Sequence, residues 1–228
     1  MDKYYLTENI FINNDNYYYN DKLMNNNNWH NLLFEIGWEK LPIQFIKTLN
    51  KLSNKRNKNS QFAVMDCGDD GNCLYSCIAT AFNFKNLNLD LNASSIRNKL
   101  ADNISNELFN DIISIYRILK LSDDFDEEWD PCNISSLDHF KELIRNGQDN
   151  YWGDHICIQL IEKIFDINII ILNNNNIYNT GSIYNINKKS IILLYINDNH
   201  FQLIGYFNNN NMNTLFKDLP VEIIKLLK

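Results

Sequence analysis

The sequence contains little proline and little glycine, with 3 Pro and 7 Gly among 228 residues. Asparagine is abundant instead and forms runs at 25–28, 173–176 and 208–211, alongside many isoleucine, lysine and tyrosine residues. This bias is typical of coding from an AT-rich genome, so we expect the source to be a large DNA virus or a protozoan parasite. We interpret the asparagine runs as a trace of origin that carries no chemistry.

The sequence also lacks the cysteine pattern of a disulfide-stabilised protein. Its five cysteines are an odd number and form no CxxC pair, which favours a reducing compartment. No apolar run approaches the roughly 20 residues that cross a bilayer, and the first residues do not resemble a signal peptide. We therefore expect a cytoplasmic protein, in the host cell if the source is viral, without membrane contact.

A basic surface is missing as well. The net charge is −7 and the pI is about 5.1, which argues against nucleic acid as the main partner because phosphate binding needs positive charge. A protein partner with a basic face suits this charge better. Apolar residues make up 45% of the chain, which is sufficient for the core of one domain of ordinary size with extensions.

The chain is organised around residues 70–73, which read Asp-Gly-Asn-Cys before an apolar stretch at 74–84. Gly68 and Gly71 predict a tight turn, and the apolar stretch predicts a buried helix that begins near Cys73. A helix start stabilises a thiolate, and the N–H groups of the turn, including those of Gly71 and Asn72, suit an oxyanion. A cysteine in an apolar helix is, however, commonly an inert core residue.

Two further motifs favour the catalytic interpretation. Residues 151–155 read Tyr-Trp-Gly-Asp-His at a helix start, and residues 197–202 read Asn-Asp-Asn-His-Phe-Gln between two apolar strands. Together with the Asp-Gly-Asn-Cys turn, they resemble the D-G-N-C, W-G-[GD] and N-H-[YF] motifs of the ovarian-tumour (OTU) cysteine proteases, in the same order. The resemblance covers about residues 61–207.

The resemblance implies a deubiquitinating protease that hydrolyses isopeptide bonds at the C-terminus of ubiquitin through a thioester. It implies Cys73 as the nucleophile, His200 as the base, and Asp70 as an active-site residue that shapes the oxyanion turn. The implied partner is ubiquitin or polyubiquitin. Trp152 and Phe201 are expected to line the substrate channel or to have a structural role.

The residue that orients His200 stays open at this stage. Many family members have Asp or Asn two positions after the histidine, where this sequence has Gln202. A glutamine carbonyl accepts a hydrogen bond from an imidazole N–H but is uncharged. Asp198 and Asn199 on the preceding turn are alternatives.

Other functions also remain open. The departure at Gln202 keeps a catalytically inactive ubiquitin-binding module possible, and the protease could act on a ubiquitin-like modifier or a polyprotein. The spacing of Cys67, Cys73 and Cys77 matches no zinc pattern, so we predict no metal and no cofactor.

The order of elements predicts an α/β fold. Apolar periodicity indicates helices near 74–84, 95–104, 112–121, 136–147 and 154–165, followed by apolar strands near 167–172, 177, 191–196 and 200–207. The nearly continuous apolar strands suggest a small sheet buried on both faces. With the family resemblance, this predicts a papain-like sandwich in which helices flank a central sheet.

The predicted organisation has four parts. Residues 1–30 are expected to form a loosely ordered arm, residues 31–60 a helical extension with a basic linker, residues 61–207 the catalytic domain, and residues 208–228 a linker and a helix. The last helix resembles the opening of an F-box, which would link the protein to a ubiquitin-ligase scaffold, but it also fits any amphipathic terminal helix.

Overall fold

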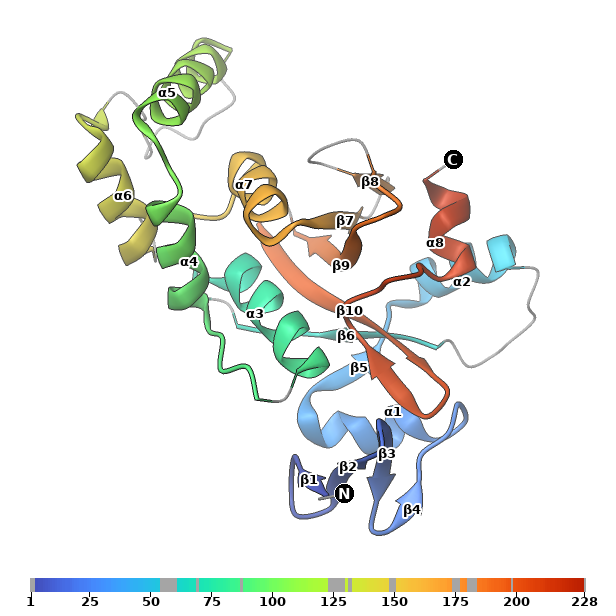
Figure 1. Cartoon of the computed structure of the whole chain (residues 1–228). Helices are drawn as coiled ribbons and strands as arrows, with labels where there is room; N and C mark the ends of the chain where they lie inside the picture. Colours follow the sequence, from blue (N-terminus) through green and yellow to red (C-terminus); the bar gives the residue numbers. More distant parts are fainter. Residues whose placement is uncertain are drawn as a thin grey trace.

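The computed structural model describes residues 3–53, 61–68, 70–86, 88–122, 130, 133–147, 151–173, 177–179, 184–197 and 199–227. Its centre is a mixed β-sheet (Figure 1). The strands follow the spatial order β5 (Trp38–Lys40), β6 (Phe62–Met65), β10 (His200–Asn208), β9 (Lys189–Ile196), β7 (Ile167–Asn173) and β8 (Ile177–Asn179), and β11 (Asn211–Asn213) also pairs with β10. The β7–β9 pair is parallel and the other pairs are antiparallel.

Both faces of this sheet are buried. Alternate residues of β7 enter two different apolar clusters, with Ile169 and Ile171 in one and Ile170 and Leu172 in the other. Helices α3 (Cys73–Lys85), α4 (Ala93–Asp102) and α7 (His155–Phe165) contribute to the first cluster, and α2 (Ile43–Ser53) and α8 (Val221–Leu226) to the second. The predicted α/β sandwich is confirmed. Strands that are covered on both faces need apolar side chains at every position, which explains the nearly continuous apolar runs in the sequence.

The helices predicted beyond the nucleophile are also present. Helix α5 (Asn106–Leu121) and helix α6 (Leu137–Asn146) lie at one end of the molecule (Figure 1). The hydroxyl of Ser136 caps α6 and the carboxylate of Asp154 caps α7, each accepting a backbone N–H of the first turn. Helix α4 begins earlier than predicted, because Asn92 forms a capping box with Ser95.

The loosely ordered arm predicted for residues 1–30 is wrong. Strands β1 (Tyr4–Tyr5), β2 (Ile10–Asn13), β3 (Asn16–Tyr19) and β4 (Lys22–Leu23) form an antiparallel sheet. The turn from β2 to β3 places Asn14 and Asp15 at φ 50° and 61°, the left-handed conformation of a two-residue hairpin. Ile10 and Tyr17 are buried in the same apolar cluster as α3, so this sheet is part of the main core.

The asparagines therefore have a conformational role that we did not predict. Asn20 and Asp21 make the next hairpin turn, and Asn209 and Asn210 join β10 to β11, all with positive φ. Asparagine tolerates this backbone region better than most residues because its short side chain bonds locally. The sequence signal was the pair of turn residues between short aromatic or apolar segments.

The helical extension predicted for 31–60 is only partly right. Helix α1 (Trp29–Leu32), the 3₁₀ helix η1 (Leu33–Ile36) and α2 are present, but β5 lies between them and pairs with β6. Gly37, at φ 88°, ends η1 and turns the chain into β5. The predicted basic linker falls on residues 54–60, outside the described ranges.

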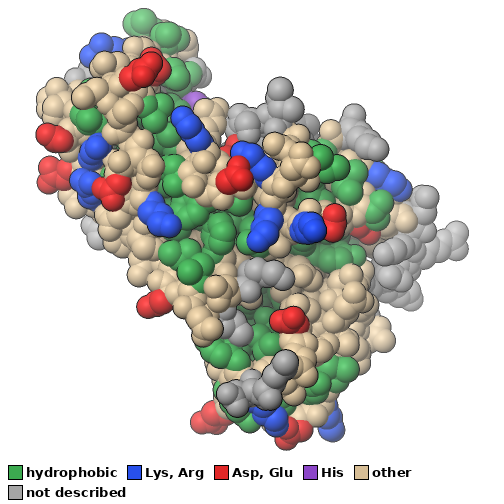
Figure 2. Space-filling view, in the orientation of Figure 1, with side chains coloured by type: hydrophobic (Ala, Val, Ile, Leu, Met, Phe, Trp, Pro, Cys, Tyr) green, Lys and Arg blue, Asp and Glu red, His purple; other side chains and the backbone are tan. Residues whose placement is uncertain are grey.

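Figure 2 shows lysine and arginine side chains interspersed with aspartate and glutamate on one face of the molecule, without a large basic patch on that face.

Among the helices of the described ranges, none has the length and apolar character needed to span a bilayer. Helix α8 places Ile223 in the cluster that it shares with α2, and its F-box resemblance stays a prediction.

We predict that Trp29→Ala lowers the free energy of unfolding by about 3–5 kcal/mol, the usual range for removing a large buried aromatic. Trp29 is fully buried and stacks on Phe207 of β10, with ring centroids 5.7 Å apart. The control is Phe34→Ala, because Phe34 is 63% exposed and its loss is expected to cost within about 0.5 kcal/mol. Urea unfolding of both variants is the measurement. Equal stability of the two would contradict the packing of the N-terminal segment into the main core.

Candidate active site

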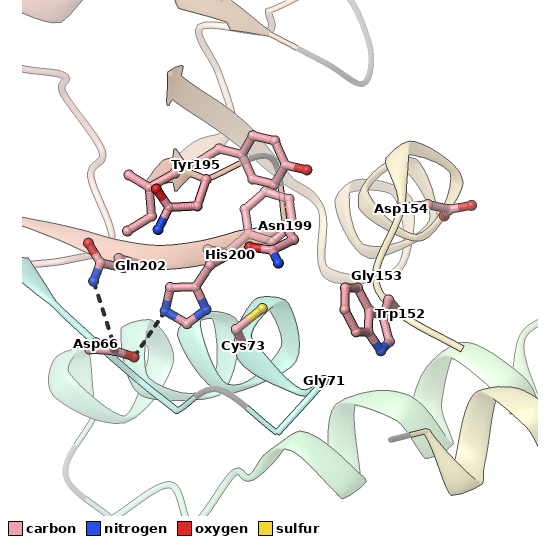
Figure 3. Close-up of a pocket in the computed structure, with 13 residues that line it drawn as sticks. Asp66, Gly71, Cys73, Trp152, Gly153, Asp154, Tyr195, Asn199, His200 and Gln202 are labelled. Atoms are coloured by element: carbon pink, nitrogen blue, oxygen red, sulfur yellow. Dashed lines mark hydrogen bonds and ion pairs between the residues drawn. The ribbon is translucent and has the colours of Figure 1, made fainter. Parts of the chain in front are cut away.

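A cleft of about 560 Å³ opens between the start of α3, the turn before β10 and the start of α7. Figure 3 shows the side chains that line it. Residues predicted for the site meet here, although they come from distant parts of the chain. The lining residues are Asp66, Gly71, Cys73, Trp152, Gly153, Asp154, Tyr195, Ile196, Asn197, Asn199, His200, Phe201 and Gln202.

The turn before α3 delivers Cys73 to this cleft. Gly68 and Gly71 have φ of 116° and 75°, which glycine adopts without strain. The Asp70 carboxylate accepts the N–H of Asn72 at 3.3 Å, a local bond typical of such turns. This N–H, which we predicted as an oxyanion donor, is thus bonded within the turn. Among the described contacts Asp70 makes no ion pair with His200, and its predicted role in the active site stays a prediction.

Cys73 is the first residue of α3, and its side chain is mostly covered. Burial raises the pKa of the Cys73 thiol, and the backbone N–H groups of Phe201 and Leu74 oppose this only in part. We predicted that the helix start would favour the thiolate, but desolvation outweighs it. The resting side chain is therefore the neutral thiol.

His200 begins β10, and its imidazole lies between two groups. Its Nε2 is 3.2 Å from Oδ1 of Asp66, and in Figure 3 the other ring nitrogen faces Cys73. Cys73 and His200, both within the described ranges, line the same cleft without a hydrogen bond between them. Catalytic hydrogen bonds commonly tighten only when substrate binds.

Asp66 is a candidate functional residue that the sequence argument missed. Gln202, which we considered as the partner of the imidazole, donates instead from Nε2 to Oδ2 of Asp66 at 3.5 Å. The backbone N–H of Gly68 donates to Oδ1 of the same carboxylate at 3.0 Å. Gln202 therefore contacts the carboxylate of Asp66, and that carboxylate in turn contacts the imidazole of His200.

Strand register explains this arrangement. In the antiparallel pair of β6 and β10, Met65 lies opposite Leu203. Extending this register by one residue sets Asp66 opposite Gln202, next to His200 on the same face of the sheet. The signal in the sequence was an aspartate directly after an apolar strand. This signal points to His200 only once the pairing of β6 with β10 is known.

The Asp66 carboxylate is ionised at neutral pH. Partial burial raises its pKa, but the Gly68 N–H, the nearby His200 and the Gln202 amide together lower the pKa below its usual value. A negative carboxylate next to Nε2 favours the proton on that nitrogen. The nitrogen that faces Cys73 is then left with its lone pair free to accept a proton.

Asn199 and Asp198 are the remaining candidates that we predicted for orienting His200. Asn199 is exposed and lines the cleft, and its backbone N–H donates to Ile196 at 3.3 Å. Asp198 lies outside the described residues. Within the described part of the chain, Asp66 is therefore the carboxylate that contacts the imidazole.

The opposite wall of the cleft comes from the start of α7. Trp152 is half exposed beside the opening, and Gly153 packs against Leu74 of α3. A Cβ at Gly153 would lie 2.4 Å from Leu74 Cδ2, closer than any real contact. Glycine is needed here because the two helices approach at their first turns.

The other described thiols do not belong to the cleft lining. Burial raises the pKa of Cys157 to about 12 and that of Cys77 well above its usual range, which leaves both unreactive. Across the described ranges, no group of three His, Cys, Asp or Glu side chains has the arrangement of a metal site.

We predict that His200→Ala raises the pKa of Asp66. The substitution removes a hydrogen bond and a favourable charge interaction, both of which stabilise the carboxylate. The direction follows because losing a positively polarised neighbour disfavours the ionised form. Carboxyl titration by NMR measures it, with Asp70 in the same spectra as an internal control. An unchanged Asp66 pKa would show that the two side chains do not interact in solution.

Comparisons with known proteins give a family match and several similar solved structures. The family model "OTU-like cysteine protease" matches residues 68–201, and a comparison with curated proteins gives no match. A solved structure described as an OTU domain in complex with ubiquitin is 18% identical, covering 72% of this chain and 80% of its own, with a TM-score of 0.44.

Two further similar structures have named sources. An OTU deubiquitinase from Wolbachia pipientis wMel is 13% identical over 72% of this chain and 96% of its own, with a TM-score of 0.45. The viral OTU domain protease from Taggert virus is 15% identical over 67% of this chain and 84% of its own, with a TM-score of 0.39. The family match covers more than half of the sequence and includes both Cys73 and His200, and on this match the chain belongs to the OTU-like cysteine protease family.

Proposed function

We propose that this protein is a deubiquitinating cysteine protease that hydrolyses the isopeptide bond at the C-terminus of ubiquitin. The observation that carries the proposal is the meeting of Cys73, His200 and Asp66 in one open cleft of a chain that belongs to a cysteine protease family. Cys73 is the nucleophile, His200 the general base and acid, and Asp66 the residue that orients the imidazole.

The first half of the reaction forms an acyl enzyme. His200 accepts the Cys73 thiol proton on the ring nitrogen that faces the sulfur, and the thiolate attacks the carbonyl carbon of the isopeptide bond. The N–H groups at the start of α3 have no partner within the helix, so that of Cys73 is suited to hold the oxyanion. His200 then gives its proton to the leaving lysine amine, and a thioester remains on Cys73.

The second half restores the enzyme. Water enters the cleft and gives a proton to His200 as its oxygen attacks the thioester carbonyl. The tetrahedral intermediate collapses, the carbon–sulfur bond breaks, and the proton returns to Cys73. Asp66 stays ionised throughout and stabilises the imidazolium that forms in each half.

The charge of the chain supports ubiquitin as the partner. A net charge of −7 complements a partner with a basic face and opposes binding to nucleic acid. The cleft is flanked by Trp152, whose half-exposed ring is a suitable apolar contact for an extended C-terminal segment.

We predict that the wild type forms a covalent adduct with ubiquitin that carries an electrophile at its C-terminus. Cys73→Ala is expected to abolish the adduct because no other described thiol lines the cleft. Intact mass spectrometry detects the adduct, and peptide mapping locates it.

The matched control is Cys67→Ser, which removes a partly exposed thiol close to the site and is expected to leave the adduct in place. If the reduced wild type gains no adduct while Cys73 is intact, the enzyme proposal fails. Binding of ubiquitin without an adduct would then favour an inactive ubiquitin-binding module. A panel of probes made from ubiquitin-like modifiers tests the choice of substrate.

We predict that Asp66→Asn and Asp70→Asn differ in their effect. Asp66→Asn removes the charge that orients and stabilises the imidazole, so kcat is expected to fall about 100-fold, within the range for losing general-base catalysis. Asp70→Asn keeps a side-chain oxygen that can accept the Asn72 N–H, so a fall of only a few fold is expected. Hydrolysis of a fluorogenic ubiquitin C-terminal substrate measures both. If Asp70→Asn lowers kcat more than Asp66→Asn does, the proposal that Asp66 orients the imidazole of His200 is wrong, and Asp70 takes the third catalytic role.

A further inference from the structure

Arg97 of α4 is a buried arginine that contacts the nucleophile turn. Its side chain is 2% exposed. Its Nε donates to Oδ1 of Asn72 at 2.7 Å, and its Nη2 donates to the carbonyl of Gly71 at 2.9 Å. Neither residue is near Arg97 in the sequence, so the fold brings the guanidinium to the turn.

The same guanidinium also reaches the opposite wall of the cleft. Its Nη1 donates to the carbonyls of Ile144 at 3.0 Å and Tyr151 at 3.2 Å. Tyr151 directly precedes Trp152 and Gly153, which line the cleft. One side chain therefore bonds to both segments between which the cleft opens.

Burying this charge is costly, and the local structure offsets the cost. Among the described residues, no carboxylate forms an ion pair with Arg97. Oxygen acceptors and the face of Tyr75, 3.8 Å from Cζ to the ring centroid, replace the lost water. A lysine would carry the same charge without the planar fork that makes these bonds together.

The contact to Gly71 fixes one peptide plane of the turn. The carbonyl of Gly71 accepts from Arg97, while the N–H of the same peptide, on Asn72, donates to Asp70. In a trans peptide these groups point in opposite directions, so the plane is held from both sides. Its orientation influences the direction of the adjoining N–H groups of Gly71 and Cys73, which are the candidates for binding the oxygen of a reacting carbonyl.

Gly147 provides the space that this arrangement needs. It ends α6 at φ 57°, and a Cβ there would lie 2.5 Å from Cζ of Arg97. Both the backbone conformation and the close approach therefore require glycine. The end of α6 therefore packs closely against the guanidinium of Arg97.

We propose that Arg97 is a positioning residue of the active site, which holds the Gly71–Asn72 peptide and the segment before Trp152 in the geometry that the transition state needs. The inference rests on the proposed function of Cys73. The oxyanion donors must be in place before the reaction, and a guanidinium bonded to both walls restricts their movement. Its removal acts on kcat rather than on substrate binding, because Arg97 lies beneath the cleft and not in its lining.

The test compares three variants of the full chain with wild type. Arg97→Lys keeps the charge and is expected to lower kcat about 100-fold, the cost of a small misplacement of reacting groups, with KM within about twofold of wild type. Asn72→Ala removes one acceptor and no side-chain cap of α3, and is expected to lower kcat about tenfold. Arg145→Lys is the control, because Arg145 forms an exposed ion pair with Asp102 and its replacement is expected to leave kcat unchanged.

A second readout does not depend on ubiquitin. The pH profile of Cys73 alkylation by iodoacetamide, resolved by peptide mass spectrometry, reports how well the turn stabilises the thiolate. Its midpoint is expected to move upward in Arg97→Lys and Asn72→Ala and to stay in place in Arg145→Lys. If the wild type does not hydrolyse the ubiquitin substrate, the proposed function fails, and this midpoint alone decides the role of Arg97.

Two results would overturn the inference. One is a folded Arg97→Lys protein with wild-type kcat, or with a change confined to KM. The other, should Arg97→Lys not fold, is an Asn72→Ala protein with wild-type kcat. Thermal unfolding of each variant separates a loss of fold from a loss of positioning.

Discussion

The pairing of β6 with β10 is the constraint on which the active site depends. It sets Met65 opposite Leu203 and so brings Asp66 beside His200 across the strand ends. The chain then leaves β6 through the glycine turn and enters α3, which packs against β10. A shift of the register by one residue would turn Asp66 to the other face of the sheet, and the imidazole would lose its partner.

This arrangement gives the three reacting groups different environments. Asp66 remains largely exposed and is stabilised as a carboxylate by its hydrogen bonds, whereas burial keeps Cys73 as a thiol, an effect to which the charge of Asp66 adds. In the proposed mechanism, the thiolate therefore forms during the reaction, when His200 accepts the thiol proton. Because oxidation follows thiolate character and exposure, a covered neutral thiol is also protected when no substrate is bound.

The sequence predicted those elements correctly whose structure follows from a local pattern, such as apolar periodicity or a short motif. The long apolar helices and strands of 74–84, 154–165 and 191–207 follow from periodicity, and the motif around Cys73 and His200 identifies the cleft. Asp66 and Arg97 could not be found in this way, because their roles arise from strand register and from helix packing between distant segments. The N-terminal sheet was missed for another reason: its strands are too short for a clear period, and its turns use asparagine where glycine is the stronger signal.

The N-terminal segment packs against the far end of β10, the strand that begins with His200. Beyond His200, β10 continues to Phe207, whose ring stacks on Trp29, and into the turn whose Asn210 carbonyl accepts the N–H of Tyr17 at 2.9 Å. Strand β11 also pairs with this end of β10. The strand is thus held at its far end by β11 and the N-terminal segment, and near His200 by β6 and β9. The proposed mechanism requires His200 to keep its orientation through its proton transfers, and a strand fixed at both ends meets this requirement. The packing of residues 10–29 into the same core as α3 therefore favours a structural role for the N-terminal segment over that of a separate arm.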